Sequence, residues 1–169
     1  MTPIVRIVRA LLCVLVVLAI SGFAGEARAG VKNGDKFGDW IIACEKPDPN
    51  QPEACYLVQT QLSDGARLLQ VTFAYRPDGT FVGLFTVPLG ILIPTGVAIK
   101  IDEGEQLALT LIRCLPDGCR ANIHFDKKVV EDLKKAKKIL VGFADGASKQ
   151  TYTATISTEG MAKGMNALK

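Results

Sequence analysis

Residues 66–87 read ARLLQVTFAYRPDGTFVGLFTV, and this stretch indicates the fold class of the chain. Its first half alternates between apolar and polar side chains, as expected of a strand with one buried face. The apolar positions are Leu69, Val71, Phe73 and Tyr75. Pro77-Asp78-Gly79 supplies a turn, and residues 81–87 are almost wholly apolar, which predicts a strand buried on both faces. The stretch therefore predicts two successive strands joined by a tight turn.

The same period-two alternation recurs along the chain. It occurs in residues 40–44, 97–101, 107–111, 121–125, 139–143 and 152–156. Turn signals such as Ser63-Asp64-Gly65, Asp102-Glu103-Gly104 and Asp145-Gly146 bound these runs. Short strands at such spacing are typical of a β-sandwich or a β-barrel. We predict a mainly β fold, an immunoglobulin-like antiparallel β-sandwich of about eight or nine strands.

Two segments have helical spacing instead. Residues 126–138 place Val129, Val130, Leu133 and Ala136 on one face, with Asp126 as the N-cap of a short inserted helix. Residues 158–169 place Met161, Met165 and Leu168 at helical spacing. Gly160 and Gly164 lower the helix propensity there, so the C-terminal helix is expected to be marginal.

The first 29 residues have the three parts of a secretory signal peptide. Arg6 and Arg9 precede an apolar run, Ala10 to Ile20, and Ala27-Arg28-Ala29 offers a cleavage site. A retained membrane anchor is the alternative, but the apolar stretch is shorter than the roughly 20 residues that a span needs. We predict a cleaved signal peptide, residues 1–29, followed by one domain, residues 30–169, without a transmembrane segment. The expected location is periplasmic or secreted.

Cleavage at this point would leave a chain that is nearly neutral. Of the 20 basic and 17 acidic residues, Arg6, Arg9, Arg28 and Glu26 would be removed. The remaining balance gives no support for nucleic-acid binding, so we expect no nucleic-acid partner.

Four cysteines, Cys44, Cys55, Cys114 and Cys119, would remain in an oxidising compartment. Four cysteines allow three connectivities. We favour local disulfides, Cys44–Cys55 and Cys114–Cys119, because the second pair flanks the turn-like Leu115-Pro116-Asp117-Gly118 and the first brackets a proline-rich loop. A zinc site and a redox pair are weaker interpretations, because neither spacing is C-x2-C.

Two surfaces are candidates for contact with a partner. The uncharged residues 79–99 contain a loop, residues 89–93, whose exposed apolar side chains would be Leu89, Ile91, Leu92 and Ile93. The alternative is a buried strand followed by a turn-rich connection. Six lysines lie on or beside the predicted helix, and Lys134 and Lys135 are the candidates for contact with a polyanion or lipid. The alternative there is an ordinary solvated helix face.

The sequence contains no catalytic motif that we recognise. His124 is the single histidine, it has no second imidazole with which to share a metal, and it is expected at the surface. We therefore expect no catalytic residues, no metal and no cofactor, and a protein that is not an enzyme. A hydrolase whose site is assembled from distant residues is a weaker hypothesis.

Several short motifs, taken in order, resemble the invasion-associated locus B (IalB) family. They are Gly38-Asp39-Trp40 followed by Cys44 and Cys55, then residues 87–90 (VPLG), 93–97 (IPTGV), Ile101-Asp102, Arg113-Cys114 and Gly118-Cys119. Gly160-Met161 stands where the family usually has Gly-Phe. The resemblance implies a secreted or periplasmic β-sandwich of Gram-negative bacteria with a role in host-cell invasion. It implies no agreed activity, cofactor or binding residue.

We predict a non-enzymatic envelope protein that binds an envelope or host-cell protein and contributes to host-cell interaction or invasion, as the family name implies. The alternative is a periplasmic carrier of a small apolar ligand held between the sheets. The high aliphatic content of residues 81–99 favours that alternative.

Overall fold

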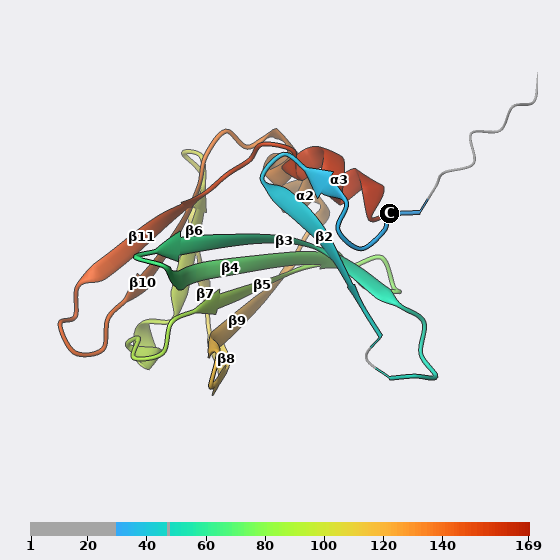
Figure 1. The fold of residues 1–169 in the computed structure, drawn as a ribbon. Helices are drawn as coiled ribbons and strands as arrows, with labels where there is room; N and C mark the ends of the chain where they lie inside the picture. The colour runs from blue at the N-terminus through green and yellow to red at the C-terminus, as the bar shows by residue number, and fades with distance from the viewer. Residues whose placement is uncertain (1–29, 47) are drawn as a thin grey trace, which may run out of the picture.

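The computed structural model describes residues 30–46 and 48–169. Over these residues, eleven strands form two antiparallel sheets that pack on a shared apolar core, with two short helices at one end (Figure 1). The predicted antiparallel β-sandwich is confirmed, with more strands than the eight or nine expected. The predicted signal peptide, residues 1–29, lies outside the described residues, and the assignment of residues 30–169 to one domain stays a prediction.

The larger sheet has seven strands in the order β1-β2-β3-β4-β5-β9-β8. Their bounds are β1 (Lys36–Phe37), β2 (Trp40–Glu45), β3 (Ala54–Ser63), β4 (Ala66–Tyr75), β5 (Phe81–Val87), β8 (Leu111–Leu115) and β9 (Gly118–Phe125). The opening stretch forms the two predicted strands, β4 and β5, with the alternating apolar residues of β4 turned inward. The expectation that β5 is buried on both faces is wrong, because Val82 and Leu84 are half-buried on its outer face and line a groove there. The sequence did not predict β3, which has polar residues on both of its faces.

The smaller sheet has four strands in the order β11-β10-β6-β7. Their bounds are β6 (Val97–Ile101), β7 (Gln106–Leu109), β10 (Ile139–Ala144) and β11 (Thr151–Ile156), and a 3-10 turn, η1 (Ile93–Thr95), precedes β6. Residues 107–111 were expected to form one strand. They divide at Thr110, because β7 ends in the smaller sheet and β8 begins in the larger one.

Both predicted helices are present. In α2 (Lys127–Lys135), the Asp126 carboxylate accepts a hydrogen bond of 2.8 Å from the Val129 N–H, which confirms the predicted N-cap. In α3 (Met161–Ala167), a Cβ on Gly164 would lie 2.5 Å from Leu57 Cδ1. This glycine weakens the helix locally but lets it approach β3 closely. No helix in residues 30–46 and 48–169 is long and apolar enough to cross a membrane.

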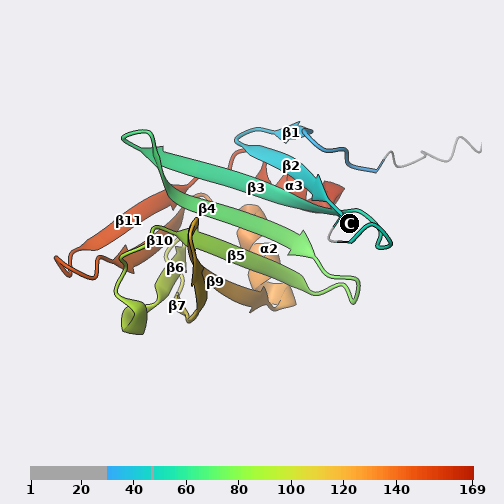
Figure 2. The same ribbon diagram turned by 60° about the horizontal axis from the view of Figure 1, so that its bottom comes forward.

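The core lies between the larger sheet and a mixed second layer. The smaller sheet covers one half of the inner face, and α2 and α3 cover the other half (Figure 1). Under this layer, the Trp40 and Phe73 rings stack with centroids 5.2 Å apart, and Phe73 also contacts Phe81 at 5.4 Å. Figure 2 looks onto the opposite, outer face of the larger sheet, which none of the described elements covers. That open face contains the candidate site.

Candidate functional site

The outer face of the larger sheet, called the arginine face below, carries side chains in rows that cross the strands. Residues directly opposite in antiparallel strands share a face, so the register defines the rows. The first row, from β3 to β8, is Thr60, Gln70, Thr86, Arg120 and Arg113. The second row, from β3 to β9, is Val58, Thr72, Leu84 and Asn122. A groove of about 510 Å³ lies over this face.

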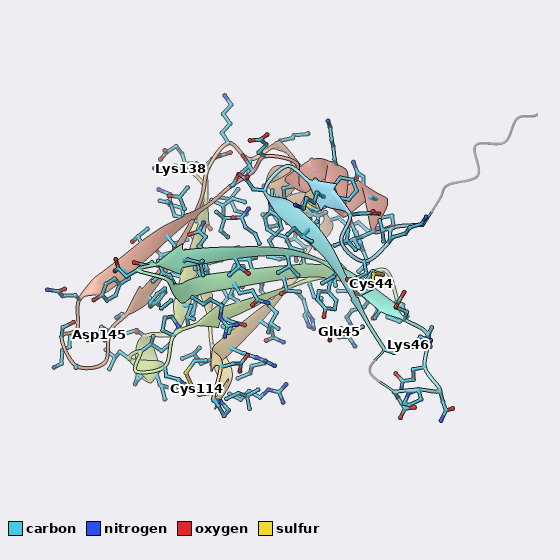
Figure 3. The ribbon with its side chains drawn as sticks, viewed as in Figure 1. Cys44, Glu45, Lys46, Cys114, Lys138 and Asp145 are labelled. Atoms are coloured by element: carbon cyan, nitrogen blue, oxygen red, sulfur yellow. A yellow bond between two sulfur atoms is a disulfide. The ribbon has the colours of Figure 1, made fainter. Side chains whose placement is uncertain are left out.

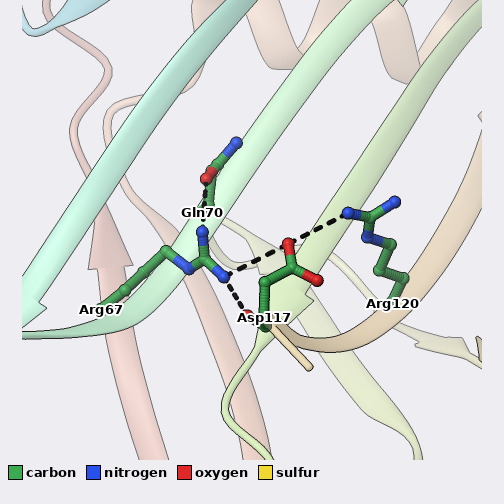
Figure 4. Close-up of polar contacts among 4 residues, drawn as sticks. All are labelled: Arg67, Gln70, Asp117 and Arg120. Atoms are coloured by element: carbon green, nitrogen blue, oxygen red, sulfur yellow. Dashed lines mark hydrogen bonds and ion pairs between the residues drawn. The ribbon is translucent and has the colours of Figure 1, made fainter. Parts of the chain in front are cut away.

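A cluster of two arginines around one carboxylate lies at one end of the groove (Figure 4). Arg120 Nη2 donates to Asp117 Oδ2 at 3.0 Å, and Arg67 Nη2 lies 3.6 Å from the same oxygen. Arg67 also donates to the Asp117 carbonyl and, at 3.2 Å, to Gln70 Oε1. The hydrogen bond from Arg120, together with the charges of Arg120 and Arg67, holds the pKa of the Asp117 carboxyl below its ordinary value. Asp117 is therefore ionised and holds both guanidinium groups in place.

The local fold of the β8–β9 hairpin places Asp117 in this cluster. Pro116 and Asp117 form the turn between the two strands, and the Cys114–Cys119 disulfide joins the residues that flank it. Gly118 has φ 137°, and a Cβ there would lie 2.5 Å from the Val87 carbonyl oxygen. The turn thus requires glycine at this position, both for its backbone conformation and for its close approach to β5.

The other end of the groove is lined by Glu45, Tyr56, Arg76 and His124. Burial raises the pKa of Tyr56 to about 12, and a hydrogen bond to Glu45 and the negative charge of Glu45 add to the shift. The Cys44–Cys55 disulfide joins residues adjacent to this pair, across β2 and β3. Both local disulfides that the spacing favoured are present, and each lies beside one end of the groove.

The predicted apolar loop, residues 89–93, is only partly exposed. Leu89 is 54% and Ile93 61% exposed, while Leu92 is half-buried. Ile91 is 8% exposed because its backbone bridges to Asp145 and its side chain joins the core, so its prediction as a contact residue is corrected. The turn-rich connection of the alternative interpretation agrees with η1, whereas β5 is fully buried on its inner face only.

Two of the six lysines on or beside α2 form ion pairs within the helix. Lys134 Nζ lies 2.8 Å from Glu131 Oε1 with only 14% of its side chain exposed, and Lys128 pairs with Asp132 at 3.1 Å. Lys134 is thus paired and largely buried, whereas Lys135 is exposed, and contact of either lysine with a polyanion stays a prediction. Figure 3 shows Lys138, just beyond α2, on the side of the molecule opposite Cys114, so the lysine surface and the arginine cluster are separate.

The described residues give little support to catalysis or metal binding. His124 is exposed on the arginine face, and its ring makes no hydrogen bond to a hydroxyl or thiol within residues 30–46 and 48–169. One grouping of metal-ligand residue types occurs there, Cys44, Glu53 and Cys55. Its two sulfur atoms form a disulfide, so they are not available as thiolate ligands.

A larger cleft, of about 1360 Å³, opens at the helical end of the sandwich. Its apolar walls include Val31, Tyr75, Val130 and Leu168, with Phe81 at its floor. The Tyr75 hydroxyl is buried without a hydrogen-bond partner in the described part of the chain, and burial raises the pKa of this group. Lys169 Nζ lies 5.4 Å from the centre of the Tyr75 ring.

Comparison with known proteins agrees with the fold and with the motifs. The family model described as Invasion associated locus B (IalB) protein matches residues 40–169. This chain belongs to the IalB family. An Invasion protein B homolog of Brucella abortus strain 2308 is 28% identical over 154 residues, which cover 89% of this chain and 88% of the relative. Invasion protein B of Bartonella bacilliformis is 28% identical over 107 residues, which cover 62% of this chain and 56% of the relative.

A solved IalB-family structure has the same fold. The crystal structure of invasion associated protein B from Bartonella henselae is 25% identical, with a TM-score of 0.70, and the match covers 79% of this chain and 94% of that chain. The resemblance to the IalB family is thus confirmed, and these relatives are named as invasion proteins, not as enzymes.

Local sequence patterns did not predict the arginine face. They indicated Asp117 only as a turn residue and the polar side of β4 only as a strand face. A sequence signal was present, because Arg113 and Arg120 directly flank the predicted Cys114–Cys119 disulfide and so lie opposite each other in the hairpin.

Proposed function

We propose that this IalB-family protein is a periplasmic or secreted, non-enzymatic envelope protein that binds a partner through the arginine face and contributes to host-cell association. The observation that carries the proposal is the uncovered face itself, with a groove of about 510 Å³ and two arginines held around one carboxylate. Preorganised polar groups on a rigid sheet lose little conformational entropy when a partner binds. The family name and the two disulfides support the role and the compartment.

Photo-crosslinking in living cells tests this proposal. A photoreactive amino acid at Asn122, exposed in the second row of the arginine face, should give one reproducible crosslinked partner. The matched control is Thr153, exposed on the smaller sheet, which should not give that product. Identical products from both positions, or none from Asn122, would contradict the proposed surface. Unchanged envelope integrity and host-cell association in a deletion mutant would contradict the proposed role.

The exposed parts of the other predicted surfaces are secondary contacts in this proposal. Leu89 and Ile93 offer apolar area at one loop, and Lys135 offers a positive charge on α2. Substituting Leu89 and Ile93 with serine should weaken partner crosslinking from Asn122 less than substitutions on the arginine face itself.

A second candidate function is carriage of a small amphiphile in the cleft at the helical end. The observation that favours it is the buried Tyr75 hydroxyl, which lacks a partner among the described residues and lies beside apolar walls. A ligand polar group would satisfy this hydroxyl. Native mass spectrometry of protein purified from its own host should show a bound mass that Tyr75→Phe reduces, and an empty wild-type protein would refute carriage.

A further inference from the structure

The arginines and the lysines of this chain occupy different surfaces. Beyond residue 29 the chain has four arginines, Arg67, Arg76, Arg113 and Arg120, and thirteen lysines. Arg67 and Arg120 form the cluster around Asp117, Arg113 pairs with Arg120 across β8 and β9, and Arg76 lines the same groove. No lysine is among the described residues that line this groove. All four arginines are thus gathered at one face, and lysines occupy the remaining surface.

This distribution points to recognition of oxyanions through pairs of parallel hydrogen bonds. Arginine presents a rigid fork of donors that matches a carboxylate, sulfate or phosphate group, whereas lysine is a compact, strongly hydrated point charge. A surface needed only for solubility would have no reason to exclude lysine. On the arginine face, a cationic group with fixed donor geometry is present at each end of the groove.

The charges at the arginine cluster are incompletely balanced. Arg67 and Arg120 share the single carboxylate of Asp117, and their side chains are only 31% and 25% exposed. Arg113 is exposed directly opposite Arg120 in the neighbouring strand, and no ion pair to it occurs in the described residues. Two guanidinium groups therefore share one carboxylate, and a third, that of Arg113, lies in the neighbouring strand. The partial burial of Arg67 and Arg120 strengthens their attraction for an added anion, because water screens them less.

Uncharged hydrogen-bonding side chains separate the arginines along the face. Gln70 lies in the row of Arg120, and Thr72 and Asn122 lie in the next row toward the other end of the groove. Thr86, also in the row of Arg120, is only 5% exposed and is not counted among the groups available to a ligand. Neighbouring strands lie about 4.8 Å apart, so donors and acceptors recur at the scale of one sugar ring. Amide and hydroxyl groups suit a chain rich in hydroxyls. The half-buried side chains of Val82 and Leu84 line the same groove and can pack against the apolar C–H face of a sugar ring. This combination of donors, acceptors and small apolar area suits an acidic glycan.

From these observations we infer that the arginine face binds an acidic glycan. Its carboxylate or sulfate groups pair with Arg113, Arg120 and Arg67, and its hydroxyl groups bond to the amide and hydroxyl side chains of the groove. This inference rests on the proposed function and names the chemistry of the partner. It assigns polyanion binding to the arginine face and not to the lysines of α2.

Calorimetric titration with two defined probes tests the inference. The probes are a heparin-derived hexasaccharide, which carries sulfates, and an oligogalacturonide, which carries carboxylates alone. At near-physiological salt, where attraction to exposed point charges is screened, wild-type protein should bind at least one probe. Arg113→Gln alone, at an exposed position, should weaken binding roughly tenfold, as expected for loss of a charge-assisted contact.

Two further variants distinguish the effect of the planar guanidinium donors from the effect of positive charge alone. Arg113→Lys with Arg120→Lys keeps both charges but should still weaken binding several-fold, because lysine lacks the planar fork. The matched control, Lys135→Gln with Lys138→Gln, removes two exposed charges from the other surface and should change the affinity less than about twofold. Thermal melts of each variant establish that the fold is retained.

Three outcomes would overturn the inference. They are equal loss in the lysine control, full binding by the arginine-to-lysine variant, and no binding of either probe by the wild-type protein. If neither probe binds while Asn122 still crosslinks to one protein, the glycan inference fails and the proposed partner-binding function stands. If Asn122 gives no crosslink and neither probe binds, both fail.

Discussion

Gln59 offers the sharpest test of how the two sheets are held together. Its side chain is 6% exposed and faces the core from β3. Its Nε2 donates to the Ser157 carbonyl at 3.2 Å, and the Ser157 N–H donates to its Oε1 at 2.9 Å. Trp40 Nε1 also donates to the Ser157 carbonyl, at 2.9 Å. One amide thus satisfies both backbone groups of the residue that follows β11.

Gln59→Met keeps the length of the side chain and removes both hydrogen bonds. The Ser157 carbonyl retains Trp40 as a donor, but the Ser157 N–H loses its acceptor. An unsatisfied buried donor costs about 1–3 kcal/mol, and the more apolar side chain offsets part of that loss. We expect the free energy of unfolding to fall by about 1–3 kcal/mol. The melting temperature should fall by roughly 3–10 °C for a chain of this size.

Urea unfolding followed by far-UV circular dichroism, with the disulfides intact, measures the change. Gln61→Met is the matched control, because Gln61 is half-buried and bonds only the Thr155 carbonyl, which water can reach. It should cost less than about 1 kcal/mol. In a double-mutant cycle, Trp40→Phe and Gln59→Met should be non-additive by about 0.5 kcal/mol or more, since both donate to one carbonyl. Wild-type stability in Gln59→Met, or a larger loss in the control, would refute this reasoning.

Three further predictions concern the arginine face and its supports. Gly118→Ala should lower the free energy of unfolding by about 2–4 kcal/mol in urea titrations, because a Cβ would meet the Val87 carbonyl at 2.5 Å in a backbone conformation that favours glycine; a change below about 0.5 kcal/mol would contradict this. Tyr56, with its pKa raised to about 12, should ionise late in an absorbance titration. Its stabilising contribution is full below pH 10 and is lost as the pH rises toward 12. Tyr56→Phe should reduce the amplitude of the late transition, and the remainder belongs to Tyr75, whose pKa burial also raises. Replacing Cys114 and Cys119 with serine should cost about 2 kcal/mol by loop entropy and should weaken binding at the arginine face, whereas unchanged binding would show that the disulfide does not position it.

Local sequence patterns predicted those parts of the fold that depend only on residues close together in the sequence. The β4–β5 hairpin, the Asp126 cap of α2 and both disulfides depend on residues close together in the sequence, so periodicity and turn chemistry were sufficient. The strand β3 was not predicted because the polar residue Gln59 interrupts its apolar face. Burial of the Gln59 side chain is explained by its hydrogen bonds to Ser157, which lies 98 positions away in the sequence.

The division at Thr110 could not be predicted for a related reason. Residues 107–111 alternate without interruption, yet β7 pairs with β6 and β8 pairs with β9. A single alternation pattern says which side chains are apolar but not which sheet provides the partner strand. In the same way, the sequence indicates only that Gly164 lowers helix propensity. The structure shows that glycine is needed there because the Leu57 side chain occupies the space beside it.

The fold class, the IalB family and the two local disulfides could be predicted without coordinates, because each depends on short-range pattern or composition. Which charges act together became evident in the folded chain alone. Arg67 is 50 residues from Asp117 in sequence, and its guanidinium reaches that carboxylate because the strand order β4-β5-β9-β8 places β4 and the β8–β9 turn in one sheet. Strand order and register are products of long-range packing, and they turn four scattered arginines into one surface.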